Sequence, residues 1–382
     1  MQMDVDTEAF VSNPLNAFLL IKHLSLDTHQ ILQYVNDASD EFSRNTNDLI
    51  LDIEELTGSV EAIDRLQTTY NLKTEDLANG IIDSDSYNMS LSVRDLFTIG
   101  TELQISEKHS RAVEYFIEAL KRNQNLNDFL EANDNEILTE LLISYEILRD
   151  YEKTIIVIDE LLKLDSKKAD EILSLKNLRK TYEEILKMEG NEKFVEPKES
   201  SEEKVTRQLC NYQIFQSAAE KSKLCCKFES KSHFSKLSPF KVEEVHLDPL
   251  IVVYHEVVSN DEIEVLKKIA KPRFELPKES LSLSTDRTFK IAWLDDESHE
   301  IVSRLSKRVE HMTGLSVETA ENLQIQQYSM GGFYKSHFYF DENLKTHNDG
   351  DRVATVLFYV SFNFLIFNQT KSIFGLFTKE VL

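Results

Sequence analysis

Residues 331–341 read Gly-Gly-Phe-Tyr-Lys-Ser-His-Phe-Tyr-Phe-Asp, and this stretch lies between two runs with the composition of strands, 321–328 and 352–360. Side chains alternate along a strand, so His337 and Asp341 share one face. A histidine and a carboxylate on one face of a sheet are the beginning of a mononuclear iron(II) site with two histidines and one carboxylate. A lone histidine among aromatic residues is also commonly a packed side chain. Evidence from the rest of the chain is therefore needed to distinguish a metal ligand from a packed histidine.

The chain upstream of this stretch alternates strands and helices. A β-branched run at 250–254 predicts a strand, and Ser259 with the acidic residues after it predicts the start of a helix that continues to Ala270. Gly314 is typical of the residue that ends a helix. The full expectation is strands at 250–254, 289–294, 323–328 and 353–360, helices at 259–270 and 299–313, and an acidic loop at 342–351. Two helices on several strands indicate an α+β domain.

The first 85 residues have the apolar spacing of amphipathic helices. Apolar residues recur at helical intervals between Phe10 and Val35 and again between Val60 and Tyr70, and Asn13-Pro14 fits a helix start. Such apolar faces commonly pair with a second copy of the same chain, and burial against the next domain produces the same pattern. Both interpretations are compatible with the sequence.

Residues 91–187 have the pattern of a tetratricopeptide-like array of helix pairs. Gly100, Ala112 and Ala119 fit close packing between helices. Stacked pairs of this kind bury a core between them and commonly bind extended peptides on the concave face. The expected helices are 94–104, 110–122, 136–148, 152–164 and 168–187.

Four aromatic residues in this array are candidates for a peptide-binding surface. They are Tyr115, Phe116, Tyr145 and Tyr182. Aromatic residues at helical spacing are more often buried in a core than exposed in a groove, so both interpretations stand. Residues 189–205 then follow as a charged segment with few large apolar residues, which is typical of a linker between domains.

The composition sets limits on the class of protein. The chain has 382 residues, of which 41% are hydrophobic and 29% charged, so it is expected to fold into two or three globular domains. Its formal net charge of −24 disfavours binding to nucleic acid or to an anionic membrane surface, because both require a basic face. A basic binding partner is compatible with this negative charge. The charge can also be explained simply by its favourable effect on the solubility of the protein.

Three cysteines lie close together in the sequence. In an oxidising compartment, Cys210 can form a disulfide with Cys225 or with Cys226, which leaves one thiol over; in a reducing compartment all three stay free. The first eight residues contain acids and lack an apolar core, so we see no signal peptide. No apolar run is long enough to span a bilayer.

Several stretches of the chain, in the same order, resemble the α subunit of collagen prolyl 4-hydroxylase. In the front half they are Phe-Val-Ser-Asn-Pro-Leu-Asn-Ala-Phe at 10–18 and Arg-Leu-Gln-Thr-Thr-Tyr-Asn-Leu at 65–72. In the rear half they lie at 270–273, 290–294, 313–315, 320–324 and 351–359. The match extends over nearly the whole chain, to about residue 360.

This resemblance implies an all-α N-terminal half and an incomplete double-stranded β-helix, or jelly roll, in an α+β C-terminal half. It implies Fe(II), 2-oxoglutarate and ascorbate as cofactors, proline in Xaa-Pro-Gly repeats of a collagen-like peptide as the substrate, and protein disulfide isomerase as the β subunit in the endoplasmic reticulum lumen. The implied domains are a helical dimerisation segment at 1–86, a tetratricopeptide-like peptide-binding domain at 87–188, a linker at 189–205, a partial catalytic domain at 206–360 and a divergent apolar tail at 361–382.

The resemblance also assigns site residues. The family motif Gly-Gly-x-Tyr-x-x-His-x-Asp places Tyr334 near 2-oxoglutarate and His337 on the iron. Within the array, Tyr145 falls nearest to the family's peptide-binding tyrosines. Cys210 and Cys226 match the family's disulfide in this region.

Two features depart from the family pattern. Tyr339 stands where the motif has its aspartate, and a neutral phenol does not readily replace a carboxylate on Fe(II). Asp341 lies on the same strand face, but about 6.6 Å further along, so it can coordinate the same iron only if the strand has a bulge. After residue 360 the family pattern of strands, distal histidine and lysine does not continue, and the last histidine is His347. Two hypotheses follow: a prolyl 4-hydroxylase α subunit, or a related chain that dimerises and binds proline-rich peptide without turnover.

Overall fold

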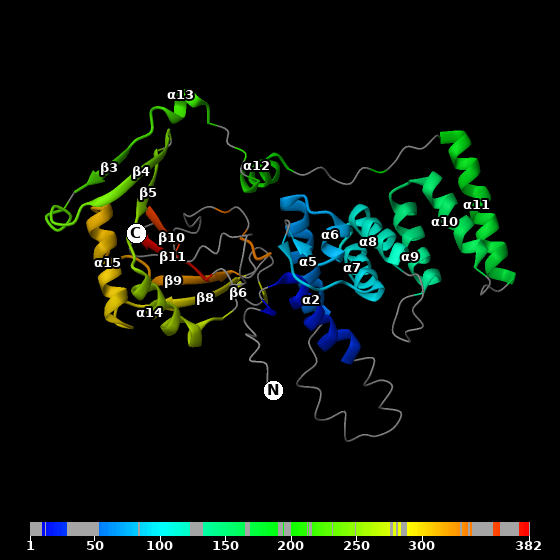
Figure 1. Ribbon diagram of the computed structural model, residues 1–382, viewed down its shortest axis with the longest axis horizontal. Coiled ribbons are helices and arrows are strands. Elements are labelled where there is room, and N and C mark those ends of the chain that lie inside the picture. The colour runs from blue at the N-terminus through cyan, green and yellow to red at the C-terminus, as the bar shows by residue number, and fades with distance from the viewer. Residues whose placement is uncertain are drawn as a thin grey trace, which may run out of the picture. The chain divides into compact units, whose positions relative to one another are not determined.

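The structure is a computed structural model of the full chain. It describes residues 10–11, 13–28, 53–82, 85–122, 133–164, 169–189, 194, 200–211, 213, 216–230, 232–248, 250–275, 278–279, 282–283, 289–328, 331–334, 337, 354–359 and 374–381. The chain divides into two compact units (Figure 1). The first consists of 1–213 and 366–368, and the second of 214–365 and 369–382.

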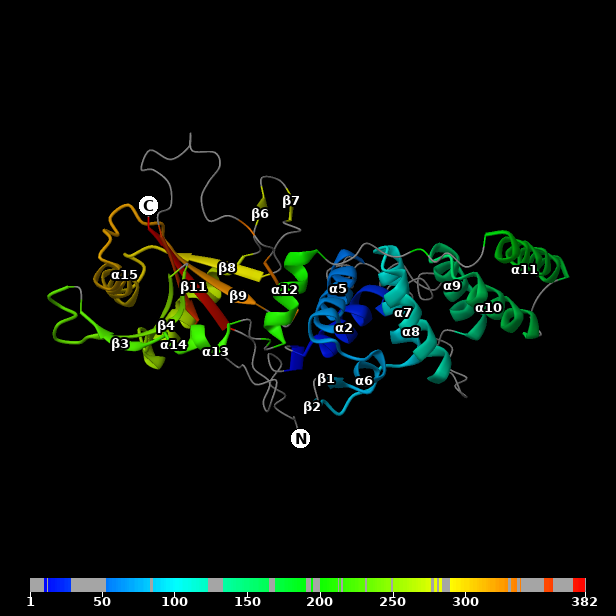
Figure 2. The same ribbon diagram turned by 90° about the horizontal axis from the view of Figure 1, so that it is seen from above.

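The first unit is built from helices. In order they are α2 (Pro14–Lys22), the π-helix η1 (His23–Asp27), α5 (Ile53–Tyr70), α6 (Thr74–Ala78), the short strands β1 (Ile81–Ile82) and β2 (Asp85–Ser86), then α7 (Val93–Ile105), α8 (His109–Arg122), α9 (Asp134–Ile147), α10 (Tyr151–Lys163), α11 (Ala169–Glu189) and α12 (Ser201–Cys210). From α7 to α11 each helix packs on the next, as the sequence predicts for stacked helix pairs (Figure 2).

Local sequence explains where these helices begin and how they connect. Ser92 and Asp95 form a reciprocal capping box at the start of α7, and Asn133 does the same for α9. The residue in the left-handed region between α7 and α8 is Glu107, with φ of 60°, and between α9 and α10 it is Arg149, with φ of 53°. These tight reversals bring the members of each pair together.

One continuous core runs through the first unit. It includes Leu15 and Phe18 of α2, Val60 and Ile63 of α5, and residues of every helix from α7 to α10. Of the two interpretations of the N-terminal apolar face, burial against the following helices is therefore confirmed for these residues. Dimerisation stays a prediction.

Gly100 of α7 allows α8 to approach closely. A Cβ atom added at Gly100 would lie only 2.5 Å from Cε1 of Phe116, whose side chain is fully buried. Ala112 and Ala119 on the same helix as Phe116 are also fully buried. The close packing predicted from these small residues is confirmed.

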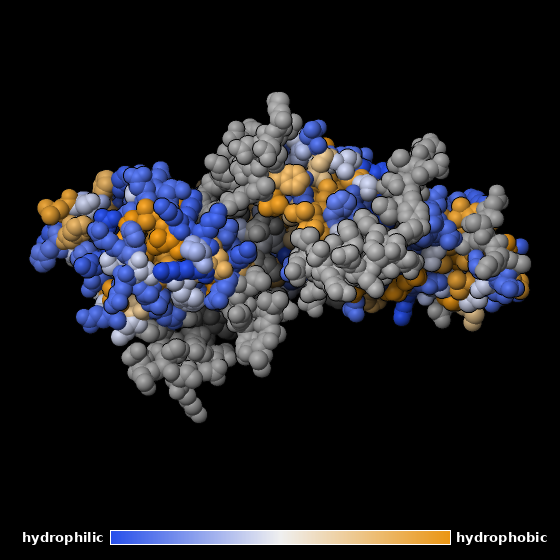
Figure 3. Space-filling view, turned by 90° about the horizontal axis from the view of Figure 1, so that it is seen from below, coloured by the Kyte–Doolittle hydropathy of each residue, from blue (hydrophilic) through white to orange (hydrophobic). Residues whose placement is uncertain are grey.

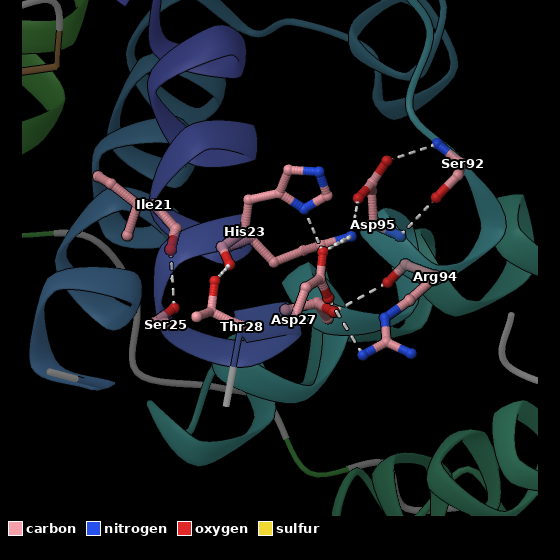
Figure 4. A network of polar contacts seen from close by, with 10 residues as sticks. Ile21, His23, Ser25, Asp27, Thr28, Ser92, Arg94 and Asp95 are labelled. Atoms are coloured by element: carbon pink, nitrogen blue, oxygen red, sulfur yellow. Dashed lines mark hydrogen bonds and ion pairs between the residues drawn. The ribbon is translucent and has the colours of Figure 1, made fainter. Parts of the chain in front are cut away.

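A buried group of charges joins the N-terminal helices to the start of α7 (Figure 4). Lys22 donates to Asp95 and lies 3.9 Å from the carboxylate of Asp27, while Arg94 contacts Asp27 at 3.2 Å. The side chains of Lys22, Asp27 and Asp95 are 6–7% exposed. His23, which is on the surface, also pairs with Asp27. The buried Lys22 and the half-buried Arg94 thus balance two buried carboxylates between three elements.

The second unit combines helices with antiparallel sheets. Its elements are α13 (Ala218–Lys221), β3 (Cys226–Glu229), β4 (Phe240–Leu247), β5 (Leu250–His255), α14 (Asn260–Ala270), the short 3-10 helix η3 (Lys271–Arg273), β6 (Lys278–Glu279), β7 (Ser282–Leu283), β8 (Phe289–Leu294), α15 (Glu300–Thr313), β9 (Leu323–Tyr328), β10 (Ala354–Tyr359) and β11 (Phe374–Val381). The α+β organisation predicted for this half is confirmed. Apolar patches interrupt the mostly polar surface of each unit on the face shown in Figure 3.

The largest sheet has the strand order β10-β11-β9-β8, and all its neighbours are antiparallel. β11 lies inside the stretch that was expected to be a divergent apolar tail, yet it pairs with β10 on one side and β9 on the other. A second sheet has the order β3-β4-β5. The sheets of the described residues do not close into a barrel.

The helices α14 and α15 pack against the larger sheet. The core between them contains Leu266 of α14, Val302 of α15 and Ile325 of β9, all at most 1% exposed. Gly314 ends α15 in the left-handed conformation, with φ of 78°, as predicted. None of the helices that the structure describes is both long and apolar enough to cross a membrane.

One ion pair fixes the start of α14 to α15. Arg308 donates to both carboxylate oxygens of Glu262, at 2.9 and 3.1 Å, and to the backbone oxygen of Val257 at 2.6 Å. Glu262 also closes the capping box with Ser259. The hydrogen bonds from Arg308 lower the pKa of Glu262 to about 2 despite an opposing effect of burial.

This pair predicts a specific acid sensitivity of the second unit. Because the pKa of Glu262 is lower in the folded than in the unfolded chain, its contribution is complete above the unfolded pKa of about 4.5 and is lost as the pH falls towards about 2. We expect the Glu262→Gln variant to have a lower free energy of unfolding than wild type at neutral pH. Between pH of about 4.5 and about 2, its free energy of unfolding should fall less than that of wild type. Urea unfolding followed by emission of Trp293, the only tryptophan, measures this.

The control is Glu264→Gln, because Glu264 lies on the same helix with a side chain that is 71% exposed. This variant should follow the wild-type pH dependence. An equal change in both variants, or none in either, would contradict the assignment of the acid response to the pair with Arg308.

Candidate active site

Four aromatic rings form a continuous ladder at the end of β8 and β9. Phe289 at the start of β8 is paired in register with Tyr328 at the end of β9, and their ring centroids are 4.6 Å apart in a stacked arrangement. Phe289 also contacts Tyr334, with centroids 5.3 Å apart. Tyr334 in turn stacks on His337 at 3.7 Å with an interplanar angle of 21°. The predicted site histidine is therefore connected by ring contacts to the interior of the sheet.

Within this ladder, burial decreases from Phe289 to His337. The side chain of Phe289 is 4% exposed, Tyr328 and Tyr334 are half-buried, and His337 is exposed. The structure thus brings together the two predicted site residues Tyr334 and His337, and it holds them next to a strand end. Asp341, the predicted carboxylate ligand, and Tyr339 lie outside the described residues.

The chemistry of the donors limits which metal this site suits. An imidazole from His337 with a carboxylate from Asp341 is a nitrogen and oxygen donor set of the kind that iron(II) accepts. Within the described residues, no group of three or more histidine, cysteine, aspartate or glutamate side chains is placed to hold a metal ion. The predicted ligand assignments therefore stay predictions.

The aromatic residues of the helical array are mostly core. Tyr115 and Phe116 are fully buried, and the hydroxyl of Tyr115 donates to Oε1 of Gln67 at 2.8 Å. Tyr145, the predicted peptide-binding residue, is 4% exposed in α9. Burial raises the pKa of Tyr145 to about 12, and Lys153 lies 5.2 Å from its ring centroid. The core interpretation is confirmed for Tyr115 and Phe116, and peptide binding by Tyr145 stays a prediction.

Tyr182 is the member of this set that is only half-buried. Its ring stacks on Tyr151 of α10 with centroids 5.2 Å apart, and its hydroxyl donates to Oε1 of Glu146 at 2.7 Å. Burial and this hydrogen bond raise the pKa of Tyr182 above the usual range of a tyrosine. Tyr151 was not among the predicted residues, because its contact with Tyr182 joins positions that are far apart in the sequence.

The three cysteines are free thiols in the structure. Cys210 ends α12 in the first unit, while Cys226 begins β3 in the second unit. Cys225 donates to Glu244 at 3.2 Å, which raises the pKa of its thiol. The pairing of Cys210 with Cys226 stays a prediction.

Sequence reasoning missed Phe289 and Tyr328 as neighbours of the site. The signal was present in the two strands, since both residues are aromatic and stand at the ends of 289–294 and 323–328. Antiparallel pairing places these ends opposite each other. The alignment of the strands had to be known before the ladder could be seen.

A stacked helical array and an α+β unit that presents a histidine beside a tyrosine define a two-part protein with a candidate active site in its second unit. A profile described as the N-terminal region of the prolyl 4-hydroxylase alpha subunit matches residues 1–84. The chain is 32% identical over 380 residues to prolyl 4-hydroxylase subunit alpha-2 of Caenorhabditis elegans, which covers 92% of this chain and 70% of that protein. It is 29% identical over 391 residues to subunit alpha-1 of Homo sapiens, covering 93% and 72%. The chain belongs to the prolyl 4-hydroxylase α subunit family.

Proposed function

We propose that this chain acts as a procollagen-proline 4-dioxygenase α subunit that hydroxylates proline in Xaa-Pro-Gly repeats. The observation that carries this proposal is the relationship to prolyl 4-hydroxylase α subunits over 92% of the chain, which includes the ladder ending in His337. The proposal applies to both units, because the sequence similarity to these α subunits extends over both.

Each part of the chain has a role in this proposal. His337 and Asp341 hold Fe(II), and Tyr334 lies beside 2-oxoglutarate. Bound iron with 2-oxoglutarate and O2 supplies the oxidising power, and ascorbate keeps the iron reduced. The four-stranded and three-stranded antiparallel sheets of the second unit belong to a double-stranded β-helix. The helical array holds the collagen-like peptide with Tyr145 among its contacts.

The proposal also includes the surroundings of the chain. Protein disulfide isomerase is the proposed β subunit, the N-terminal segment pairs with a second copy, and the endoplasmic reticulum lumen is the proposed compartment. The disulfide between Cys210 and Cys226 fits that oxidising compartment. The net charge of −24 fits a peptide substrate better than a nucleic acid, because nucleic acid requires a basic face.

The test is peptide-dependent release of CO2 from carboxyl-labelled 2-oxoglutarate. The full chain is produced together with protein disulfide isomerase and is supplied with Fe(II), ascorbate and a Pro-Pro-Gly repeat peptide. We expect CO2 release together with the gain of one oxygen atom by the peptide, measured by mass spectrometry. The control peptide has alanine in place of the proline before each glycine and should give neither signal.

A second function is favoured by one residue, Tyr339, which stands where the family has its carboxylate ligand. In this alternative the chain dimerises and binds proline-rich peptide without turnover. Calorimetric binding of the same peptide without CO2 release would support the alternative and overturn the first proposal. If the peptide neither binds nor is oxidised, both proposals are wrong.

A further inference from the structure

We propose that Phe289 is a positioning residue for His337 and acts through the ring of Tyr334. This inference rests on the proposed function for its importance to turnover. Its geometric part, that Phe289 sets the orientation of His337, can be tested without any turnover.

The placement of His337 is the first step. Its side chain is exposed, and it contacts the face of Tyr334, with ring centroids 3.7 Å apart and an angle of 21°. This stacking contact restricts rotation of the imidazole about its side-chain bonds. The ring of Tyr334 therefore contributes to the orientation of His337.

The second step is the support of Tyr334. Its ring lies against Phe289 with centroids 5.3 Å apart and an interplanar angle of 54°, a separation within the range of interacting aromatic pairs. Phe289 is 4% exposed and stacks on its register partner Tyr328 on the other strand. Tyr334 thus rests on a buried ring that stacks on Tyr328 of the neighbouring strand.

The third step is the rigidity of the strands below. β8 and β9 pair along their full lengths, from Phe289 with Tyr328 to Leu294 with Leu323. Ala292 and Leu294 of β8 are fully buried in the core of the second unit. An antiparallel pair anchored in this way keeps Phe289 fixed while the exposed end of the ladder meets solvent.

The stacking geometry suits a metal-binding histidine. The lone pairs and N–H bonds of an imidazole lie in the plane of the ring, so a neighbour on the face of the ring restricts its rotation and leaves its nitrogens directed outwards. A ligand held in advance needs less reorganisation when metal and substrate bind. Phe289 would in this way affect the site without touching any reacting atom.

The experiment uses the full chain labelled with 13C-histidine. The His337→Gln variant identifies the resonances of His337 among those of the ten histidines. In wild type, we expect the ring protons of His337 to be shifted upfield by the neighbouring Tyr334 ring. In Phe289→Leu we expect this shift to be largely lost, and in Phe289→Tyr we expect it to be retained.

The kinetic readout follows the spectroscopic one. We expect Phe289→Leu to lower kcat for peptide oxidation roughly tenfold with little change in the KM of the peptide, and Phe289→Tyr to recover most of that loss. The matched control is Phe228→Leu, since Phe228 lies on β3 of the same unit with a side chain that is 73% exposed. It should resemble wild type in both measurements.

Specific results of these measurements would contradict the positioning role of Phe289. If the resonances of His337 stay at their wild-type positions in Phe289→Leu, or if Phe289→Tyr is as impaired as Phe289→Leu, the positioning role is wrong. Emission of Trp293 on β8 reports whether each variant is folded. If Phe289→Leu does not fold, Tyr328→Leu removes the half-buried ring behind Phe289, and a wild-type His337 signal in that variant would overturn the proposal.

Failure of the proposed function gives a different pattern. In that case the His337 resonances respond to Phe289→Leu as predicted while wild type releases no CO2. The geometric inference then holds and the enzymatic proposal falls.

Discussion

Replacement of Lys22 by methionine is expected to lower the free energy of unfolding of the first unit by about 3–5 kcal/mol. Methionine preserves most of the volume of the lysine side chain but removes its charge. Asp95 then loses its cation, and Asp27 is left with Arg94 and His23. The cost is large because these carboxylates are buried, where an unpaired charge cannot be hydrated.

Urea unfolding followed by circular dichroism at the helical band measures this change. Emission of Trp293, in the second unit, serves as an internal control and should be unaffected. Lys163→Met is the matched substitution at an exposed pair, since the side chains of Lys163 and Glu160 are 67% and 49% exposed, and it should change stability very little. The double variant Lys22→Met with Asp95→Asn should recover part of the loss. Equal effects at Lys22 and Lys163 would show that the buried network contributes little.

Two glycine-to-alanine substitutions are expected to have opposite effects on the first unit. Alanine at Gly100 brings a methyl group to 2.5 Å from the buried ring of Phe116, and such overpacking typically costs about 1–3 kcal/mol. Alanine at Gly58 in α5 meets no atom within 4 Å and should stabilise the helix by about 0.5–1 kcal/mol. Both residues lie inside helices, so the helical preference of alanine is common to the two variants.

The same urea unfolding measures both variants. Because the helical preference of alanine acts in both variants, their free energies of unfolding should differ by the overpacking cost of about 1–3 kcal/mol, with Gly100→Ala below wild type and Gly58→Ala above it. Adding Phe116→Leu to Gly100→Ala should relieve part of the crowding, although the smaller side chain packs less well. A stabilised Gly100→Ala chain would mean that α7 and α8 are less closely packed than their contact indicates.

The helices of both units could be predicted well from sequence because their apolar spacing and their end signals agree. The stop at Gly314 and the N-cap at Ser259 are examples in which one residue type determines the boundary. Helix α12 was missed, since none of its residues is buried and it therefore has no apolar stripe to recognise. Its only local signal was the capping box formed by Ser200 and Glu203, which lay inside the segment expected to be a linker.

Strands were harder to predict where pairing is irregular. In β4 the apolar residues Phe240 and Val242 alternate correctly, but the register shifts between Glu244 and His246, so the alternation breaks in the middle of the strand. β11 has a similar irregularity between Phe374 and Leu376. A period of two is a strong signal only when no residue interrupts it.

The candidate site was predictable only in part for a related reason. His337 and Tyr334 are close in the sequence, so a local motif was sufficient to select both. Phe289 lies almost fifty positions earlier and reaches Tyr334 only because β8 and β9 pair in one particular register. Long-range contacts of this kind depend on strand pairing, which residue types alone do not determine.

The position of β11 between β9 and β10 has a consequence for the order of folding. β9 and β10 follow each other along the chain but do not pair directly, so their sheet can form only after the later β11 has joined them. The first unit consists mainly of helices that pack on their sequence neighbours, and such local contacts form quickly. We therefore expect the helical unit to fold first. Until β11 joins the sheet, the hydrogen-bonding groups at one edge of β9 are unpaired, and this edge can associate with other chains or bind a chaperone.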